Sequence, residues 1–247
     1  MSTPLDARVG VVVPTYKESE NIVALVDEVA AVLPGVEIVV VDDSPDDATA
    51  AAVRNAGRDR VRIVHRDAKS GRGSAVLLGI GMLLESGCEQ IAEMDADFSH
   101  PPSQLPELLA TARSKGTDLL IASRYLPSSR IDNWPRSRRL FSRTANFVAR
   151  NLLGVPVRDY TNGYRMYSRR GATLITETCG RLGRGFIPLS EILVNLHFRG
   201  YAIAEVPTHF VNRLRGESSV NAREIADALS GLWKIFLLRR RLQKKVA

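Results

Sequence analysis

Short apolar runs alternate with segments of helical periodicity along the first half of the chain, and this alternation restricts its possible folds more than any other feature. The apolar runs are expected strands, at residues 9–13, 36–41, 61–65, 90–94 and 119–122. The segments between them repeat apolar residues every three or four positions, at 18–33, 48–56 and 75–85. Strands that are apolar along their whole length are typical of a parallel sheet with helices on both faces. The sequence therefore predicts an α/β fold with a mainly parallel central sheet.

Polar residues follow four of the expected strands. They are the segment 14–16, the pair Asp42 and Asp43, the segment 69–73 and the segment 95–97. In open sheets of this kind, ligands bind beyond the carboxyl ends of the strands. We therefore expect these four segments to meet in one crevice.

Asp95 and Asp97 form the most informative of these segments. Side chains alternate along a strand, so two carboxylates at this spacing point the same way. Two negative charges at such a short distance repel each other unless a cation bridges them. Mg²⁺ or Mn²⁺, bound together with a substrate phosphate, is the usual bridging cation. The alternative is an Asp-rich turn that caps the helix after Pro101 and Pro102.

The composition restricts the classes of partner. The chain has 247 residues, a formal net charge of +7 and a pI of about 9.7. Such a balance suggests an anionic partner: nucleic acid, a phosphorylated small molecule or an acidic lipid surface. Cys88 and Cys179 lack metal-ligand spacing, so we expect a reducing compartment. The first residues have no apolar core of signal-peptide length, and no run approaches the ~20 apolar residues of a membrane span.

The second half of the chain is less regular. We expect a mobile loop, two helices, a strand and a polar loop, at 127–136, 140–153, 187–198, 201–206 and 209–220. A final amphipathic helix is expected at 221–238, followed by a basic tail. This divides the chain into a catalytic domain at 1–220 and a helix with its tail at 221–247. The helix either packs on the domain or lies in a membrane interface and meets anionic headgroups.

Several common motifs are absent from the sequence. No G-x-G-x-x-G follows the first strand and no Walker A sequence occurs, which excludes dinucleotide and ATPase sites. There is no nucleophile elbow, and the four histidines lack zinc spacing; we interpret them as structural, although His100 adjoins the carboxylate pair. Near the N-terminus, Tyr16 could stack on a base while Glu18 binds its amino or ribose groups. Alternatively, Thr15 and Glu18 form a capping box of the helix.

Taken together, the motifs resemble a known enzyme family. The segments 11–18 (VVVPTYKE), 40–46 (VVDDSPD), 69–73 (KSGRG) and 95–97 (DAD) are similar to successive motifs of inverting GT-A glycosyltransferases of family 2. The segments 122–125 (ASRY), 138–146 (RRLFSRTAN), 159–165 (DYTNGYR) and 211–219 (VNRLRGESS) resemble dolichol-phosphate mannose synthases. The similarity runs in order over roughly residues 8 to 240. It implies a GT-A, Rossmann-like fold with a C-terminal amphipathic helix.

The resemblance also implies roles for individual residues. Nucleotide-sugar binding is implied for Pro14, Tyr16, Glu18, Asp42, Asp43, Lys69, Asp95 and Ala96. Metal binding is implied for Asp97, with Asp95 beside the diphosphate and Ser99 as a further ligand through water. The acceptor phosphate is expected at Arg124, Arg138, Ser142 and Arg213, and the residues expected to act in catalysis are Asp95, Asp97, Arg124 and Arg213.

Three departures from the family pattern concern the donor sugar and the acceptor more than the fold. Ser99 stands where Gln is common, and Asn212 stands where Asp is common. The segment 126–130 (LPSSR) lacks the usual glycine run.

The implied reaction transfers a hexose, mannose from GDP-mannose, to the phosphate of a polyprenol with inversion at the anomeric carbon. Mg²⁺ or Mn²⁺ and arginines would stabilise the leaving diphosphate. A phosphate acceptor is already anionic near neutral pH, so it needs positioning more than a general base. The expected location is the cytoplasmic face of a membrane, held peripherally and with a separate membrane-anchoring protein as a further candidate partner.

Other functions were weighed against this one. A family 2 enzyme using a UDP-sugar or GDP-sugar with a soluble, peptide or glycan acceptor would keep the donor site. A processive polysaccharide synthase is disfavoured because the chain has no Gln-x-x-Arg-Trp motif. A nucleic-acid-binding module would explain the basic patches, but it would not explain the Asp pairs at strand ends, and aromatic–basic stacking motifs are absent. We therefore expect no nucleic acid partner.

Overall fold

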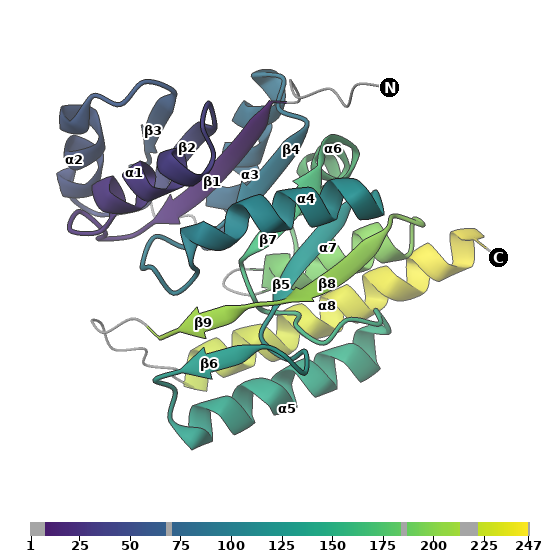
Figure 1. The fold of residues 1–247 in the computed structure, drawn as a ribbon. Helices are drawn as coiled ribbons and strands as arrows, with labels where there is room; N and C mark the ends of the chain where they lie inside the picture. The colour runs from purple at the N-terminus through teal and green to yellow at the C-terminus, as the bar shows by residue number, and fades with distance from the viewer. Residues whose placement is uncertain (1–7, 68–70, 184–186, 213–221, 247) are drawn as a thin grey trace.

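A seven-stranded sheet forms the centre of the molecule (Figure 1). The computed structural model describes residues 8–67, 71–183, 187–212 and 222–246, with backbone alone at 222–229 and 245–246. The strand order is β3-β2-β1-β4-β7-β5-β8. The bounds are β1 Val9–Thr15, β2 Glu37–Asp42, β3 Val61–His65, β4 Gln90–Glu93, β5 Leu119–Ser123, β7 Arg165–Ser168 and β8 Ile203–Pro207. Strand β7 is antiparallel to β4 and β5, and every other pairing in this sheet is parallel.

Helices cover both faces of the sheet, as the apolar strands predict. The helices are α1 Ile22–Val32, α2 Ala48–Ala56, α3 Arg72–Glu85, α4 Leu105–Lys115, α5 Arg136–Leu153, α6 Arg169–Thr178, α7 Ile187–His197 and α8 Ala222–Val246. Within β1, Val11 and Val13 pack in one core cluster with residues of α1 and α4, whereas Val12 packs in the other with residues of α3 and α7. This alternation places one hydrophobic core on each face. The expected α/β fold with a mainly parallel central sheet is confirmed.

Several local expectations are wrong. The segment expected to be a mobile loop contains β6 (Arg130–Asp132), which pairs in parallel with β9 (His209–Val211) in the segment expected to be a polar loop. Strand β7 and helix α6 were not expected. The last helix does not give way to a separate basic tail, because α8 continues to Val246.

The capping box, one of the two interpretations of Thr15 and Glu18, does not form. Helix α1 begins at Ile22, with Asn21 as its N-cap residue, while Thr15 belongs to β1. Thr15 donates its hydroxyl to Asp42 instead of to a helix terminus. Tyr16, Lys17 and Glu18 therefore lie between the strand and the helix, at the carboxyl end of β1.

Across the described ranges, no helix is both long enough and apolar enough to cross a bilayer.

Candidate active site

The polar segments predicted to meet do lie at the carboxyl ends of adjacent strands. Thr15 at the end of β1 is in register with Asp42 at the end of β2, and its Oγ1 donates to Asp42 Oδ1 at 2.8 Å. The Asp43 amide donates to the Thr15 carbonyl at 3.0 Å. Strand β4, which precedes Asp95, pairs with the other side of β1. Three of the expected segments thus follow neighbouring strands of the sheet.

Asp42 and Asp43 organise the loops around them. Asp42 is fully buried and also accepts from the Ser44 hydroxyl at 2.7 Å and contacts His65 Nδ1 at 2.9 Å. Asp43 accepts from Arg66 Nε at 2.5 Å and from the Gly71 amide at 2.9 Å. The second contact joins the end of β2 to the N-terminus of α3.

Asp95 is held by Arg72, a residue that the sequence did not single out. Arg72 Nε donates to Asp95 Oδ1 at 2.8 Å, and its Nη1 donates to Glu93 Oε1 at 2.5 Å. Glu93 is fully buried and accepts at its other oxygen from the Tyr167 hydroxyl at 2.8 Å. Burial alone would raise the pKa of Asp95, but the charge and hydrogen bond of Arg72, together with the other basic groups nearby, lower it. Arg72 thus keeps the Asp95 carboxylate ionised and fixes its orientation through Oδ1.

Asp97 sits in a tight turn after β4. Its Oδ1 accepts from the Ser99 amide at 3.1 Å, and the intervening Phe98 has a φ of 57°. Such backbone is unfavourable for a non-glycine residue and is often found at functional sites. Lys17, at the end of β1, has a similar φ of 60°. Ser99 itself is only 2% exposed, and its amide fixes the Asp97 carboxylate. Its role as a further metal ligand through water stays a prediction.

His100 supports the carboxylate pair without facing the crevice. It is fully buried and stacks on Tyr164, with the ring centroids 4.9 Å apart. Its Nδ1 accepts weakly from the Asp95 amide at 3.4 Å, which leaves Nε2 to donate to Asn162 Oδ1 at 2.9 Å. Burial lowers the pKa of His100, so the ring is neutral near pH 7. The structural interpretation of this histidine agrees with these contacts.

Asp95 and Asp97 could bind a divalent cation if a substrate supplied further oxygen ligands. Among the described residues, no group of three His, Cys, Asp or Glu side chains could enclose a metal ion. Asp95 and Asp97 are partly exposed, and one Asp95 oxygen is free of Arg72. Mg²⁺ is commonly bound by one or two carboxylates, with phosphate oxygens and water completing its shell. The donor set fits that mode.

Tyr16 and Ala96, both expected at the nucleotide, differ in exposure. Tyr16 is 42% exposed, with Lys17 Nζ 5.9 Å from its ring centre, whereas Ala96 is 3% exposed. Pro14 is in register with Val41, next to the Asp42 pairing. The Glu18 amide donates to Thr49 Oγ1 at 3.1 Å, and a Glu18 carboxylate oxygen accepts from Asn21. Lys69 lies outside the described residues.

The residues expected to bind an acceptor phosphate are separated by the structure into two environments. Arg124 is 8% exposed and makes a bidentate pair with Asp159, with both N–O distances at 2.8 Å. Arg138 and Ser142 lie on α5, where Arg138 donates to Asn212 at 3.1 Å and Ser142 accepts from the Tyr125 hydroxyl at 2.6 Å. Arg213 lies outside the described residues.

An aromatic cluster surrounds the Arg124 guanidinium. Its central carbon lies 5.4 Å from the ring centres of Trp134 and Phe210 and 5.6 Å from that of Tyr125. These rings come from the segment after β5, the loop before α5 and β9. Arg124 therefore ties together the segments that carry the other expected acceptor residues.

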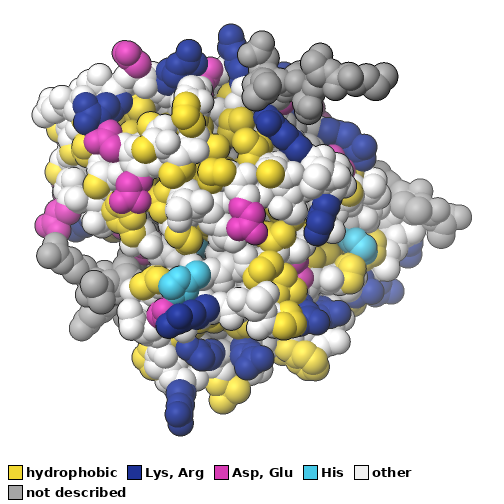
Figure 2. Space-filling model, viewed as in Figure 1, with side chains coloured by type: hydrophobic (Ala, Val, Ile, Leu, Met, Phe, Trp, Pro, Cys, Tyr) yellow, Lys and Arg dark blue, Asp and Glu magenta, His cyan; other side chains and the backbone are white. Residues whose placement is uncertain are grey.

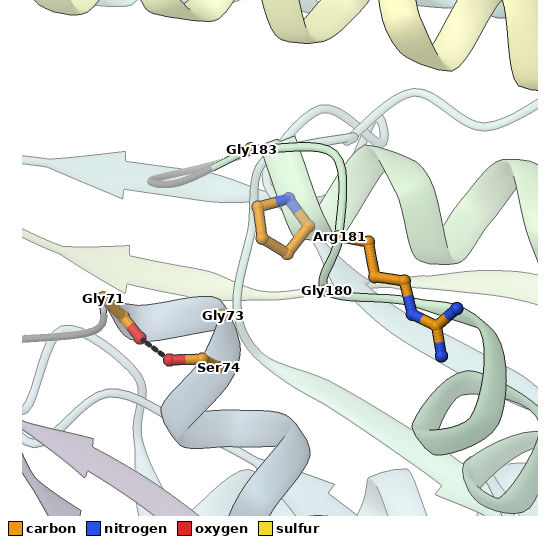
Figure 3. Close-up of a pocket in the computed structure, with 7 residues that line it drawn as sticks. Gly71, Gly73, Ser74, Gly180, Arg181 and Gly183 are labelled. Carbon is orange, nitrogen blue, oxygen red and sulfur yellow. Dashed lines mark hydrogen bonds between the residues drawn. The ribbon is translucent and has the colours of Figure 1, made fainter.

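A cavity of about 250 Å³ opens beside the N-terminus of α3 (Figure 3). It is lined by Gly71, Gly73, Ser74, Gly180, Arg181, Gly183 and Pro188. The Ser74 hydroxyl donates to the Gly71 carbonyl at 2.9 Å, and the Arg181 side chain points away from this pair. Glu191 holds the far wall by accepting from the Gly180 amide at 3.0 Å. Segment 180–183 carried no motif, so the sequence could not reveal this wall.

Comparison with known proteins places the chain in a family of sequences. The sequence model of glycosyl transferase family 2 matches residues 10–173. The polyprenol monophosphomannose synthase of Mycolicibacterium smegmatis is 38% identical over 222 residues, which cover 89% of this chain and 83% of that protein. The undecaprenyl-phosphate mannosyltransferase of Micrococcus luteus is 36% identical over 229 residues, covering 90% and 91%.

Solved structures show the same fold. Glucosyl-3-phosphoglycerate synthase from Mycobacterium tuberculosis, crystallised with Mn²⁺, UDP and glucosyl-3-phosphoglycerate, superposes with a TM-score of 0.66 at 22% identity. The superposition covers 95% of this chain and 80% of that one.

Proposed function

The chain belongs to glycosyltransferase family 2, and we propose that it transfers mannose from GDP-mannose to a polyprenyl phosphate with inversion. One observation carries the proposal. Asp95 and Asp97 stand together at the carboxyl end of β4 in a chain that is 38% identical, over 89% of its length, to a polyprenol monophosphomannose synthase. The identity supports the acceptor, and the carboxylate pair supports the chemistry.

The donor lies across the ends of β1, β2 and β4 in this proposal. Tyr16 stacks on the base, while Glu18, Asp42, Asp43 and the segment around Lys69 shape the nucleotide pocket. Asp97 with Asp95 holds a divalent cation, which when bound neutralises charge on the departing diphosphate. Arg72 keeps Asp95 ionised and aimed at that position, as its 2.8 Å contact supports.

The chemical step needs no general base. An oxygen of the acceptor phosphate forms the new bond to the anomeric carbon, and the bond from that carbon to the diphosphate oxygen breaks on the opposite face. The acceptor is already ionised, so no proton has to be removed. This fits the surroundings of the carboxylates, because His100 is buried and both of its ring nitrogens have partners.

The acceptor phosphate is assigned to Arg138 and Ser142, which lie on α5, and to Arg213, which lies outside the described residues. Arg124 was also expected there, but its bidentate pair with Asp159 supports a positioning role for it. A polyprenyl acceptor resides in a membrane, so we place the enzyme peripherally on the cytoplasmic face, with a separate anchoring protein as a further candidate partner.

A matrix of donors and acceptors tests the proposal. GDP-mannose, GDP-glucose, UDP-glucose and UDP-galactose are each offered with polyprenyl phosphate or with soluble phosphorylated acceptors, in Mg²⁺ or Mn²⁺. We expect mannolipid from GDP-mannose alone, and GDP with metal should raise the melting temperature more than UDP. Donor turnover without a lipid product would contradict the acceptor assignment.

Asp97→Ala tests the metal assignment. Turnover should fall below detection, while circular dichroism and the melting temperature without ligands stay close to those of the wild type. An active Asp97→Ala variant would refute the assignment.

A further inference from the structure

The outward face of α5 is apolar, which is the reverse of an ordinary surface helix. Its buried residues are Asn146, Ala149 and Leu153. The large apolar side chains of the helix are exposed instead, at Leu140 (68%), Phe141 (60%), Phe147 (67%) and Val148 (48%). An amphipathic helix normally turns such residues toward the core.

Helical geometry shows that these residues form one continuous stripe. Successive residues turn by roughly 100°, so positions three, four and seven apart share a face. Leu140, Thr144, Phe147, Val148 and Asn151 follow this spacing, with Phe141 beside them. The stripe lies opposite the buried face and carries no charge.

Arginines flank this apolar stripe. Arg136, Arg139, Arg143 and Arg150 follow the same spacing on an adjoining strip of the helix. With Arg138 the helix holds five arginines and no acidic residue. Figure 2 shows basic and hydrophobic side chains gathered together along the lower edge of the molecule, where Figure 1 places α5.

Helix α8 runs beside α5 and is less suited to the same role. Arg239 on α8 donates to the Leu152 carbonyl of α5 at 2.6 Å. Ile235 and Leu242 are buried in the core, and Leu232, Phe236 and Leu238 pack against it. Only Trp233 and Leu237 are large exposed apolar residues among the described side chains of α8. Of the two alternatives for residues 221–238, packing on the domain agrees with these contacts of α8.

We propose that α5 lies in the surface of a bilayer that contains anionic lipids, with its apolar stripe among the acyl chains and its arginines at the lipid phosphates. Helices of this composition bind in the interface plane through buried apolar area and electrostatic attraction. A second copy of the chain is a poorer occupant, because two helices that each carry five arginines and no acid would repel. Anionic headgroups complement the charge of the arginine strip beside the apolar stripe.

This orientation of α5 places the bilayer close to the residues assigned to the acceptor phosphate. That step rests on the proposed function. Ser142 and Arg138 lie on the inner side of α5, where they contact Tyr125 and Asn212. A helix is only about 10 Å across, so the lipid surface and the acceptor-phosphate residues would be one helix diameter apart. A polyprenyl phosphate could then present its phosphate to the site while its chain stays in the bilayer.

Vesicle flotation of the full chain tests the surface directly. The double variant Phe141→Gln, Phe147→Gln keeps the charge of α5 and removes two exposed rings. Binding to vesicles of equal parts phosphatidylcholine and phosphatidylglycerol should weaken by on the order of tenfold for each ring. Leu78→Gln is the control, since Leu78 on α3 is also exposed (40%) and should have no effect. Binding should also fall with added salt and on vesicles of phosphatidylcholine alone.

Two results would overturn the proposal. One is flotation of the double variant equal to that of the wild type, with Trp233→Gln abolishing it instead, which would assign the contact to α8. The other is a wild-type dimer in light scattering that the double variant converts to a monomer without loss of flotation, which would assign the stripe to a second copy.

An activity comparison separates this proposal from the proposed function. The double variant should turn over a short, water-soluble prenyl phosphate at the wild-type rate but lose activity on long-chain polyprenyl phosphate in vesicles. If neither acceptor is used by the wild type, the proposed function fails while the flotation result still decides the surface.

Discussion

Arg72 joins two parts of the site that are far apart in the chain. It opens α3, yet it contacts Glu93 and Asp95 at the end of β4 and donates to the carbonyl of Gly163. The guanidinium fits there because Gly163 has no Cβ, which Arg72 would otherwise contact closely. Two of its partners, Glu93 and Asp95, are carboxylates, so a planar, permanently charged group suits the position.

Arg72→Lys should impair catalysis more than folding. Lysine retains the charge but cannot bond both carboxylates in fixed geometry, so Asp95 loses its orientation. We expect kcat/KM to fall by about 10–100-fold, with a higher metal concentration needed for half-maximal rate. Arg62→Lys, at an exposed position of β3, is the matched control. A variant with unchanged metal dependence would contradict the role of Arg72.

The buried pair of Arg124 and Asp159 should appear in the pH dependence of stability. Burial alone would raise the pKa of Asp159, but Arg124 and backbone hydrogen bonds lower it. A lowered carboxyl pKa stabilises the fold above the ordinary value near pH 4, and this contribution is lost as the pH falls through the folded-state pKa.

Asp159→Asn should therefore lower the free energy of unfolding at pH 7 by about 3 kcal/mol, because Arg124 remains buried without its counterion. The loss should be smaller at pH 3, as urea titrations at both pH values would show. Asp27→Asn, which breaks the exposed pair with Arg58, should change little. Equal losses at both pH values would exclude the pKa mechanism.

Site residues could be predicted only where chemistry is local in the sequence. Asp95 and Asp97 adjoin the end of an apolar strand, so their position at the sheet edge followed from pattern alone. Arg72 and Glu93 are 21 positions apart, and nothing local connects them. Arg124 was expected to bind phosphate because its segment resembles a family motif, whereas its pairing with Asp159, 35 positions later, is not local in the sequence.

At the scale of elements, strands with continuous apolar runs were predictable and short mixed strands were not. Strand β7 (RMYS) contains one charged and two hydroxyl side chains within four positions, and Arg165 is nevertheless fully buried, with its guanidinium donating to backbone carbonyls. Strands β6 and β9 are three residues each and are defined by pairing across 79 positions (130 with 209). Neither the mixed strand β7 nor the three-residue strands β6 and β9 show a hydrophobic periodicity that would predict a strand.

Replacing either of two glycines of α3 by alanine should change the free energy of unfolding in opposite directions. A Cβ at Gly79 would press on Val12 of β1, with Val12 Cβ at 3.2 Å, while a Cβ at Gly81 meets nothing within 4 Å. Gly79→Ala should lower the free energy of unfolding by about 1–3 kcal/mol through overpacking. Gly81→Ala should raise it by about 0.5–1 kcal/mol through helix propensity. Chemical denaturation measures both, and a stabilising Gly79→Ala would show that α3 is not held close to the sheet.

At the scale of the molecule, α8 belongs to the same folding unit as the sheet. Its Ile235 and Leu242 are members of the core cluster that also contains Val12 and Ile121. The helix packs against α7, where Gly231 allows close approach to Ile187. We therefore expect residues 221–247 to unfold together with the catalytic domain and not as a separate appendage.

Neighbouring positions of α8 test this expectation. Ile235 is fully buried and Trp233 is 58% exposed. Ile235→Ala should lower the free energy of unfolding by about 2–5 kcal/mol, whereas Trp233→Ala should change it by no more than about 0.5 kcal/mol. Both variants should melt in one transition. A second, earlier transition for Ile235→Ala alone would mean that α8 detaches independently.

The place of β7 in the sheet has a consequence for how the chain is made. Residues 165–168 pair with 90–93 on one side and 119–121 on the other, although both partners precede them in the chain. During translation β5 therefore emerges before either of its neighbours, β7 and β8, exists. An unpaired strand edge is a template for association with other chains. Ribosome-bound chains that end before residue 165 should thus depend on chaperones to prevent association. This dependence should end once β7 has emerged and can pair with β5.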